Sequence, residues 1–142
     1  MEQRDLIKDQ IEQLGRVLGK IVAEFLGSNS PGLFEQAIQV SQEQMKSQLD
    51  IDIEALLAAD VKDMEAYLLA RKLAFEHFEQ LSLYLMEIGK RKMEHDKEIA
   101  KQYFVRSLEL INVADKVSSS ASFKRIQMKS SIQGMLERCT EE

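Results

Sequence analysis

Residues 3–26 read QRDLIKDQIEQLGRVLGKIVAEFL, and the spacing of the apolar residues in this stretch decides the fold class. Apolar residues recur at intervals of four and three, at Ile7, Ile11, Leu14, Leu18, Ile21 and Phe25. Side chains at such intervals lie on one face of an α-helix, whereas those of a half-buried strand alternate at every second residue. The stretch therefore predicts one long amphipathic helix from Gln3 to Leu26.

Two glycines lie one turn apart inside this predicted helix. Each costs about 1 kcal/mol of helix propensity relative to alanine, so we expect a closely packed neighbour to compensate. The chain's own core is the first interpretation of the apolar face, and a seam between two copies is the second. The candidate seam consists of Leu14, Gly15, Leu18, Gly19 and Phe25. A helix lying on a membrane surface is a third interpretation, disfavoured because acidic side chains offset its few cations.

The remainder of the chain also has helical spacing. Ser30 is a candidate cap, with Pro31 at the first position of a second helix. Residues 49–53 alternate like a strand but have no partner strand, so we interpret them as a linker before a short helix. Asp60 or Asp63 is expected to cap the next element, and residues 63–89 form one helix or two, with a break near residues 70–73.

Two more helices are expected, over residues 96–114 and from residue 123 onward. The residues predicted to face inward are Ile99, Ala100, Tyr103, Phe104, Leu108 and Ile111 in the first of these, and Phe123, Ile126, Ile132, Met135 and Leu136 in the second. Because no strand is predicted, the fold class is all-α, built from antiparallel helical hairpins. We expect a single domain over residues 1–142, with N-terminal helices in 1–60 and a hairpin region in 61–140.

The composition is that of a folded, cytoplasmic protein. The 142 residues are 44% hydrophobic and 30% charged, which excludes general disorder. Cys139 is the single cysteine and cannot form a disulfide within the chain, so a reducing compartment is expected. The sequence has no signal-peptide pattern and no apolar run long enough to cross a membrane.

Charge is distributed unevenly along the chain. The formal net charge is −5, but residues 71–142 contain thirteen Lys/Arg against eleven Asp/Glu. A cationic surface for phosphate groups would use Lys90, Arg91, Lys92, Lys97, Lys101, Arg106, Lys124, Arg125 and Lys129. The preferred interpretation is a solvated helix surface, and nucleic-acid association is kept as the alternative.

No cluster of residues predicts a catalytic centre. His77 has Leu73, Ala74, Gln80 and Leu81 at three and four residues, none of them a metal ligand, and Cys139 has no base nearby in sequence. The serines at 118–120 lack the glycines of a nucleophile elbow, and no glycine-rich phosphate loop follows a strand. We therefore expect no catalytic residue, no metal, no cofactor and no enzymatic activity.

The stretch from Phe78 to Leu110 resembles a tetratricopeptide repeat, a pair of antiparallel helices. The residues that match its first helix are Phe78, Leu81, Ser82, Leu85 and Gly89, with Gly89 at the expected turn, and those that match its second helix are Ala100, Phe104, Ser107, Leu108, Glu109 and Leu110. Serines stand where the repeat usually has glycine and alanine, and the turn is about six residues longer, near residues 90–95. The match extends strongly over these 33 residues and loosely over about 60.

The opening of the chain, EQRDLIKDQIEQLGRVLGKIVAEFLG (residues 2–27), together with the C-terminal hairpin, is also similar to an uncharacterised bacterial family of helical proteins. That resemblance implies a bacterial origin and no assigned activity. Repeats of the tetratricopeptide kind hold a peptide or partner segment in a concave groove. The resemblance therefore implies a protein or peptide partner, or a second copy in a homodimer. No membrane partner is expected, because the sequence has no apolar run long enough to cross a membrane. Lys101 and Arg106 are the candidate residues for holding acidic groups of the partner.

Overall fold

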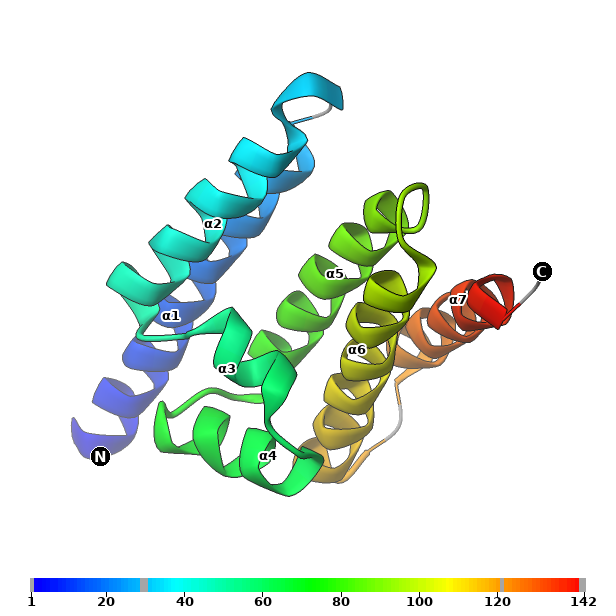
Figure 1. Cartoon of the computed structure of the whole chain (residues 1–142). Coiled ribbons are helices and arrows are strands. Elements are labelled where there is room, and N and C mark those ends of the chain that lie inside the picture. Colours follow the sequence, from blue (N-terminus) through cyan, green and yellow to red (C-terminus); the bar gives the residue numbers. More distant parts are fainter. Residues whose placement is uncertain (1, 29–30, 121, 141–142) are drawn as a thin grey trace. The chain divides into compact units, whose positions relative to one another are not determined.

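The computed structural model describes residues 2–28, 31–120 and 122–140, with side chains described from residue 8 onward except at residue 31. No strand occurs among these residues, and the chain is all-α (Figure 1). In chain order the elements are α1 (Glu2–Leu26), the 3-10 turn η1 (Pro31–Leu33), α2 (Phe34–Leu49), α3 (Ile53–Ala58), α4 (Val61–Ala70), α5 (Phe75–Lys92), α6 (Lys97–Ser118) and α7 (Phe123–Thr140).

Most predicted boundaries are confirmed, but the second helix begins later than predicted, and α6 ends at Ser118, four residues later than predicted. Residues 50–52 are a linker, Asp60 caps α4, and residues 63–89 belong to two helices rather than one. Ser30, the candidate cap, lies outside the described residues. Pro31 opens a 3-10 turn, so α2 begins at Phe34, three residues later than predicted.

The chain divides into two compact units, residues 1–77 and residues 78–142. The sequence predicted α4 as part of the hairpin region of residues 61–140, whereas in the structure α4 is bonded to the link between α2 and α3 and belongs to the unit of residues 1–77. The Tyr67 hydroxyl accepts from the Asp52 backbone N–H at 2.9 Å and donates to the Asp50 carbonyl oxygen at 3.3 Å. No sequence pattern indicates that a tyrosine in the middle of a predicted helix makes such bonds. The boundary between the two units could therefore not be predicted from the sequence.

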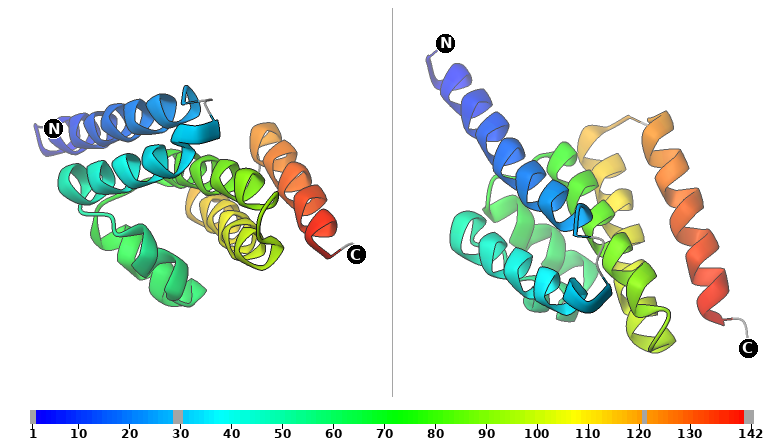
Figure 2. Two further views of the ribbon diagram at one scale, coloured as in Figure 1. Left: turned by 45° about the horizontal axis from the view of Figure 1, so that its top comes forward. Right: turned by 90° about the horizontal axis from the view of Figure 1, so that it is seen from above.

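In the first unit, α1 and α2 pack side by side and run in opposite directions (Figures 1 and 2). The rings of Phe25 and Phe34 meet near the turn, with centroids 6.0 Å apart. The buried apolar residues of the unit are Leu18, Ile21, Val22, Phe25, Ile38, Met45, Leu49, Ile51, Ile53, Leu56, Met64, Leu68 and Leu73. The inward face of α1 is thus used by the chain's own core.

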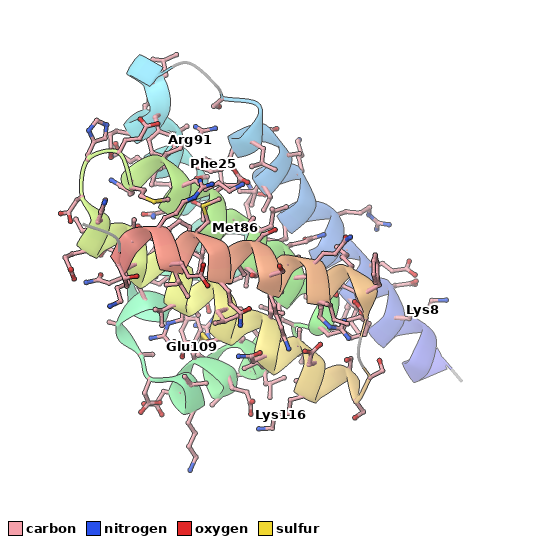
Figure 3. All side chains as sticks on the ribbon, turned by 90° about the vertical axis from the view of Figure 1, so that its right-hand side faces the viewer. Lys8, Phe25, Met86, Arg91, Glu109 and Lys116 are labelled. Atoms are coloured by element: carbon pink, nitrogen blue, oxygen red, sulfur yellow. The ribbon has the colours of Figure 1, made fainter. Side chains whose placement is uncertain are left out.

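In the second unit, α5 and α6 lie side by side and run in opposite directions (Figure 1), and α7 packs along α6. The Ser82 and Ser107 hydroxyls each donate to the other residue's carbonyl oxygen at 2.8 Å, which holds the two backbones close together. Met86 of α5, labelled in Figure 3, belongs to an apolar cluster shared by the three helices. The other buried members of that cluster are Ala100, Phe104, Ile111 and Ile132.

Gly89 does not form the turn that was predicted for it. It lies inside α5, which continues to Lys92, and the next helix begins after Asp96, whose carboxylate accepts from two backbone N–H groups. A Cβ at position 89 would lie 2.8 Å from Cε1 of Phe104. Glycine is therefore needed here for the close approach of a buried ring, not for a turn.

Gly89→Ala is expected to destabilise the protein by about 1 kcal/mol. The gain of about 1 kcal/mol in helix propensity is outweighed by about 1–3 kcal/mol of overpacking, because Phe104 is fully buried and cannot move aside. Gly134→Ala is the matched control. It is the same change inside α7, where a Cβ meets nothing within 4 Å, so it should stabilise by up to about 1 kcal/mol. Urea unfolding of both variants measures whether the two changes in the free energy of unfolding have opposite signs. Changes of the same sign would contradict the close packing of Phe104 against position 89.

Three residues predicted to face inward are exposed instead. Ile99 is 40% exposed, Phe123 75% and Ile126 55%. In α6 the inward position of the first turn belongs to Ala100, one residue after Ile99. In α7 it belongs to Arg125, which is 2% exposed. Successive helical residues are rotated by about 100°, so a buried Arg125 turns its neighbours Phe123 and Ile126 away.

Candidate functional site

An open groove of about 580 Å³ lies beside α1 in the first unit. Four aliphatic side chains form its walls, three glutamines and two cations complete it, and none of the described lining residues is acidic. These residues are Gln10, Ile11, Gln13, Leu14, Val17, Gln48, Leu49, Arg71 and Lys72. An apolar concave surface with a few polar groups is the usual form of a binding site.

Two helix ends place the polar side of the groove. Helix α2 ends at Leu49 and is followed by Asp50 in the left-handed conformation, with φ 56°. Helix α4 ends at Ala70, and Lys72 is left-handed in turn, with φ 61°. Both turns bring the chain sharply back, so that residues about 60 positions from α1 line the same hollow as α1.

Arg71 fastens these two helix ends together. Its Nε donates to the Asp50 carbonyl oxygen, its Nη1 donates to the Tyr67 carbonyl oxygen at 3.0 Å, and its Nη2 lies 3.3 Å from the Asp50 carboxylate. The guanidinium carbon also stacks 3.5 Å above the centre of the Tyr67 ring. Cations are favourable at helix C-termini, where the last carbonyl groups carry partial negative charge. Arg71 is thus mainly a structural part of the groove.

Lys72 is the exposed cation at the rim. Its backbone N–H bonds the Leu69 carbonyl oxygen at 2.9 Å, and that of Leu73 bonds the Leu68 carbonyl oxygen at 3.4 Å. These two bonds form a Schellman motif, whose left-handed residue is usually glycine. None of the ion pairs among the described residues includes Lys72. The groove therefore offers an aliphatic wall and one exposed ammonium group to an occupant.

Lys72→Gly is expected to stabilise the protein by about 1 kcal/mol, because a left-handed lysine has a Cβ clash that glycine lacks. Lys72→Ala is the matched control, since alanine keeps the Cβ and should gain nothing. Thermal or urea unfolding of the two variants checks the prediction. An equal gain in both would show that the lysine side chain, not its backbone conformation, is the source of the strain.

The candidate seam residues of α1 do not share one environment. Leu18 and Phe25 are buried in the first unit, whereas Leu14, Gly15 and Gly19 are half-buried. A Cβ at Gly15 would lie 3.4 Å from Nε2 of His77, so an imidazole ring fills the space beside this glycine. Of the five seam residues, Leu14 alone lines the groove.

The two candidate partner-binding cations of α6 also differ. Lys101 is exposed, whereas Arg106 is 9% exposed and pairs with Glu109 of the same helix at 3.1 Å. Glu109 is labelled in Figure 3. The structure therefore leaves Lys101 accessible to a partner and holds Arg106 against its own helix.

Three cations of the proposed phosphate-binding surface belong to an internal ion-pair network. Arg125 of α7 donates to Glu79 of α5 at 2.9 Å and to Asp115 of α6, while Lys124 and Lys129 pair with Glu79 and Asp115 respectively. Burial lowers the pKa of Arg125, but its hydrogen bonds to Asp115 and Glu79 raise it above the ordinary value. The network ties three helices together, and the cationic surface is smaller than the sequence suggests.

Asp115→Asn is expected to remove part of the acid sensitivity of the fold. The hydrogen bond from Lys129 holds the pKa of Asp115 below its ordinary value, although burial acts against it, and the bond from Arg125 lowers the pKa further. Because the folded pKa is lowered, the stabilisation is complete above about pH 4, the unfolded pKa, and is lost as the pH falls through the folded pKa. Urea unfolding from pH 7 down to about pH 3 should show that the variant has a lower free energy of unfolding than the parent protein at pH 7. This difference should become smaller in acid. A deficit that stays constant with pH would contradict this role.

His77 and Cys139 are placed as packing residues. Both ring nitrogens of His77 contact backbone groups, the Ala74 N–H at 2.7 Å and the Ile11 carbonyl oxygen at 3.0 Å. Cys139 packs on the core of the second unit, and burial raises the pKa of its thiol, although Lys97 and Lys101 act in the opposite direction. No group of three or more potential metal-ligating side chains occurs in the described part of the chain.

The site thus defined is an apolar groove on an all-α protein, without a constellation that specifies a reaction. Neither a scan against protein-family models nor searches of curated proteins and of solved structures found a match to this chain. None of the helices, in the residues that the structure describes, has the length and apolar character needed to cross a lipid bilayer.

Proposed function

We propose that the protein is a non-catalytic protein-interaction module that holds a segment of a partner in the groove beside α1. The observation that carries this proposal is the combination of four aliphatic side chains, three amides and an exposed lysine in one hollow of about 580 Å³. Burial of such a surface by a partner is favourable, at roughly 25 cal/mol per Å² of apolar area. Rigid helices on both sides preform the groove, which lowers the entropic cost of binding.

We further propose that the module is tetratricopeptide-like and acts in the bacterial cytoplasm. The tight α5–α6 hairpin supports the first part, because Ser82 and Ser107 allow a close crossing of antiparallel helices. The single cysteine, which forms no disulfide within the chain, supports a reducing compartment. The partner-binding groove lies in the other unit, so the hairpin acts as scaffold in this proposal.

Photo-crosslinking inside cells tests the interaction. A photoreactive amino acid replaces Gln13, an exposed residue of the groove lining, or Glu12, its exposed neighbour that does not line the groove. We expect a discrete protein adduct from position 13 and none from position 12, because successive residues of a helix point about 100° apart. No adduct at position 13, or equal adducts at both positions, would reject the groove as the interaction site.

A further inference from the structure

We infer that the occupant of the groove is an amphipathic helix that carries acidic side chains beside its apolar face. This inference rests on the proposed function and names the class of partner. The groove walls are themselves helical, so their backbone N–H and C=O groups are bonded within the helices. An extended peptide would find no ladder of backbone partners there and would bury unsatisfied polar groups. A helical occupant satisfies its backbone N–H and C=O groups by hydrogen bonds within its own helix.

The spacing of the wall residues fits this occupant. Ile11, Leu14 and Val17 follow one another at intervals of three along α1, and Leu49 faces the same hollow from the end of α2. Such a row accepts the ridge of a second helix, whose apolar side chains recur at three and four residues. The glutamines Gln10, Gln13 and Gln48 add neutral donors and acceptors along the groove.

The charges that line the groove determine which sign of charge the partner should carry. Residues 1–77 contain fourteen Asp/Glu and eight Lys/Arg, yet the described residues that line the groove include two cations and no carboxylate. Arg71 is already paired with Asp50, so Lys72 is the cation that can meet a partner. The Asp50 carboxylate beside the groove is paired with Arg71 at 3.3 Å. More distant acidic residues of the unit are screened over about 8 Å at physiological salt, whereas an ammonium group at the rim acts at contact distance.

The backbone of Lys72 is a second observation at the same position. The residue is left-handed, with φ 61°, where glycine would be less strained. Residues held in strained backbone conformations cluster at active sites and ligand clamps. A lysine that is unfavourable for the turn and exposed at the rim of an apolar groove is accounted for by a partner carboxylate that it reaches. Lys72→Gly should therefore stabilise the free protein and weaken binding.

Three synthetic peptides of about 18 residues, long enough to form a helix, test the inference. All three carry the same leucine face and differ only in having Glu, Gln or Lys at the flanking positions. Fluorescence anisotropy with the full-length protein should show the Glu peptide binding about five- to tenfold more tightly than the Lys peptide, the range of a rim charge pair and its repulsive counterpart. Lys72→Glu should reverse the order. Lys62→Glu, on the exposed surface of α4 outside the groove lining, is the matched control and should keep it.

The outcomes separate this inference from the proposed function. No binding by any of the peptides, or a charge preference that Lys72→Glu leaves unchanged, overturns the acidic helix as occupant. An adduct at position 13 would then still support an interaction module with another kind of partner. An adduct consisting of two copies of this chain, matched by a dimer in sedimentation, also overturns the inference. Loss of both the adduct and peptide binding rejects the groove altogether.

Discussion

Arg125→Met is expected to lower the free energy of unfolding by about 3–5 kcal/mol, because it leaves the buried carboxylate of Glu79 without its buried cation. Glu79 is 7% exposed and holds Arg125 at 2.9 Å. Methionine replaces most of the apolar stem of arginine, so the loss would not come from a cavity. The free energy of unfolding from urea titration, followed by circular dichroism, measures the effect.

Lys124→Met is the matched control for this prediction. Lys124 contacts the same carboxylate as Arg125, at 3.2 Å, but its side chain is 70% exposed. An exposed ion pair contributes about 0–1 kcal/mol, so this variant should be close to the parent protein. The double variant Arg125→Met, Glu79→Leu should recover much of the stability, since it removes the unpaired buried charge as well. Equal losses in Arg125→Met and Lys124→Met would contradict the role of burial.

The buried position of Arg125 also explains where sequence reasoning about α7 failed. A pattern of apolar residues predicted Phe123 and Ile126 as core, because a charged side chain is rarely assigned to the interior. Its partners Glu79 and Asp115 come from two other helices, 46 and 10 residues away. Pairing at such separations is a tertiary property, and a single sequence has no periodic signal for it.

The helices themselves were predictable because their determinants are local. The apolar stripe of α1 is repeated within each turn, and the Asp60 carboxylate accepts from the Asp63 N–H only three residues away, at 2.8 Å. The break between α4 and α5 was indicated only approximately. It depends on the left-handed Lys72, and no glycine marks that position.

The groove could not be predicted, although two of its apolar residues, Ile11 and Leu14, were placed on an apolar helix face. The hollow beside them depends on how α1 meets the ends of α2 and α4. The expected binding residues were instead taken from the cations of α6. Two left-handed turns, one after α2 and one after α4, position Arg71 and Lys72 beside α1. These turns have no strong sequence signature.

His77→Leu is expected to destabilise the protein by about 2–3 kcal/mol, because two backbone contacts of a buried ring are lost. His77 is 1% exposed, and it is the third residue of α5. Its Nδ1 accepts from the Ala74 N–H at 2.7 Å, so Nε2 carries the proton and donates to the Ile11 carbonyl oxygen at 3.0 Å. The ring therefore joins the start of α5 to α1 and has no lone pair left for a metal ion or a substrate proton.

His77→Gln separates the two contacts. The contact between the Ala74 N–H and Nδ1 of His77 is equivalent to one of the two hydrogen bonds of a capping box. In that motif a glutamate or glutamine at the third helical position accepts from the N–H of the cap residue. Glutamine can still accept from Ala74 but does not reproduce the ring against Gly15, so the variant should lose only about 1 kcal/mol. Hydrogen exchange at Ala74 should accelerate in His77→Leu and much less in His77→Gln. Equal stability of His77→Leu and the parent protein would contradict the structural role of the two ring contacts.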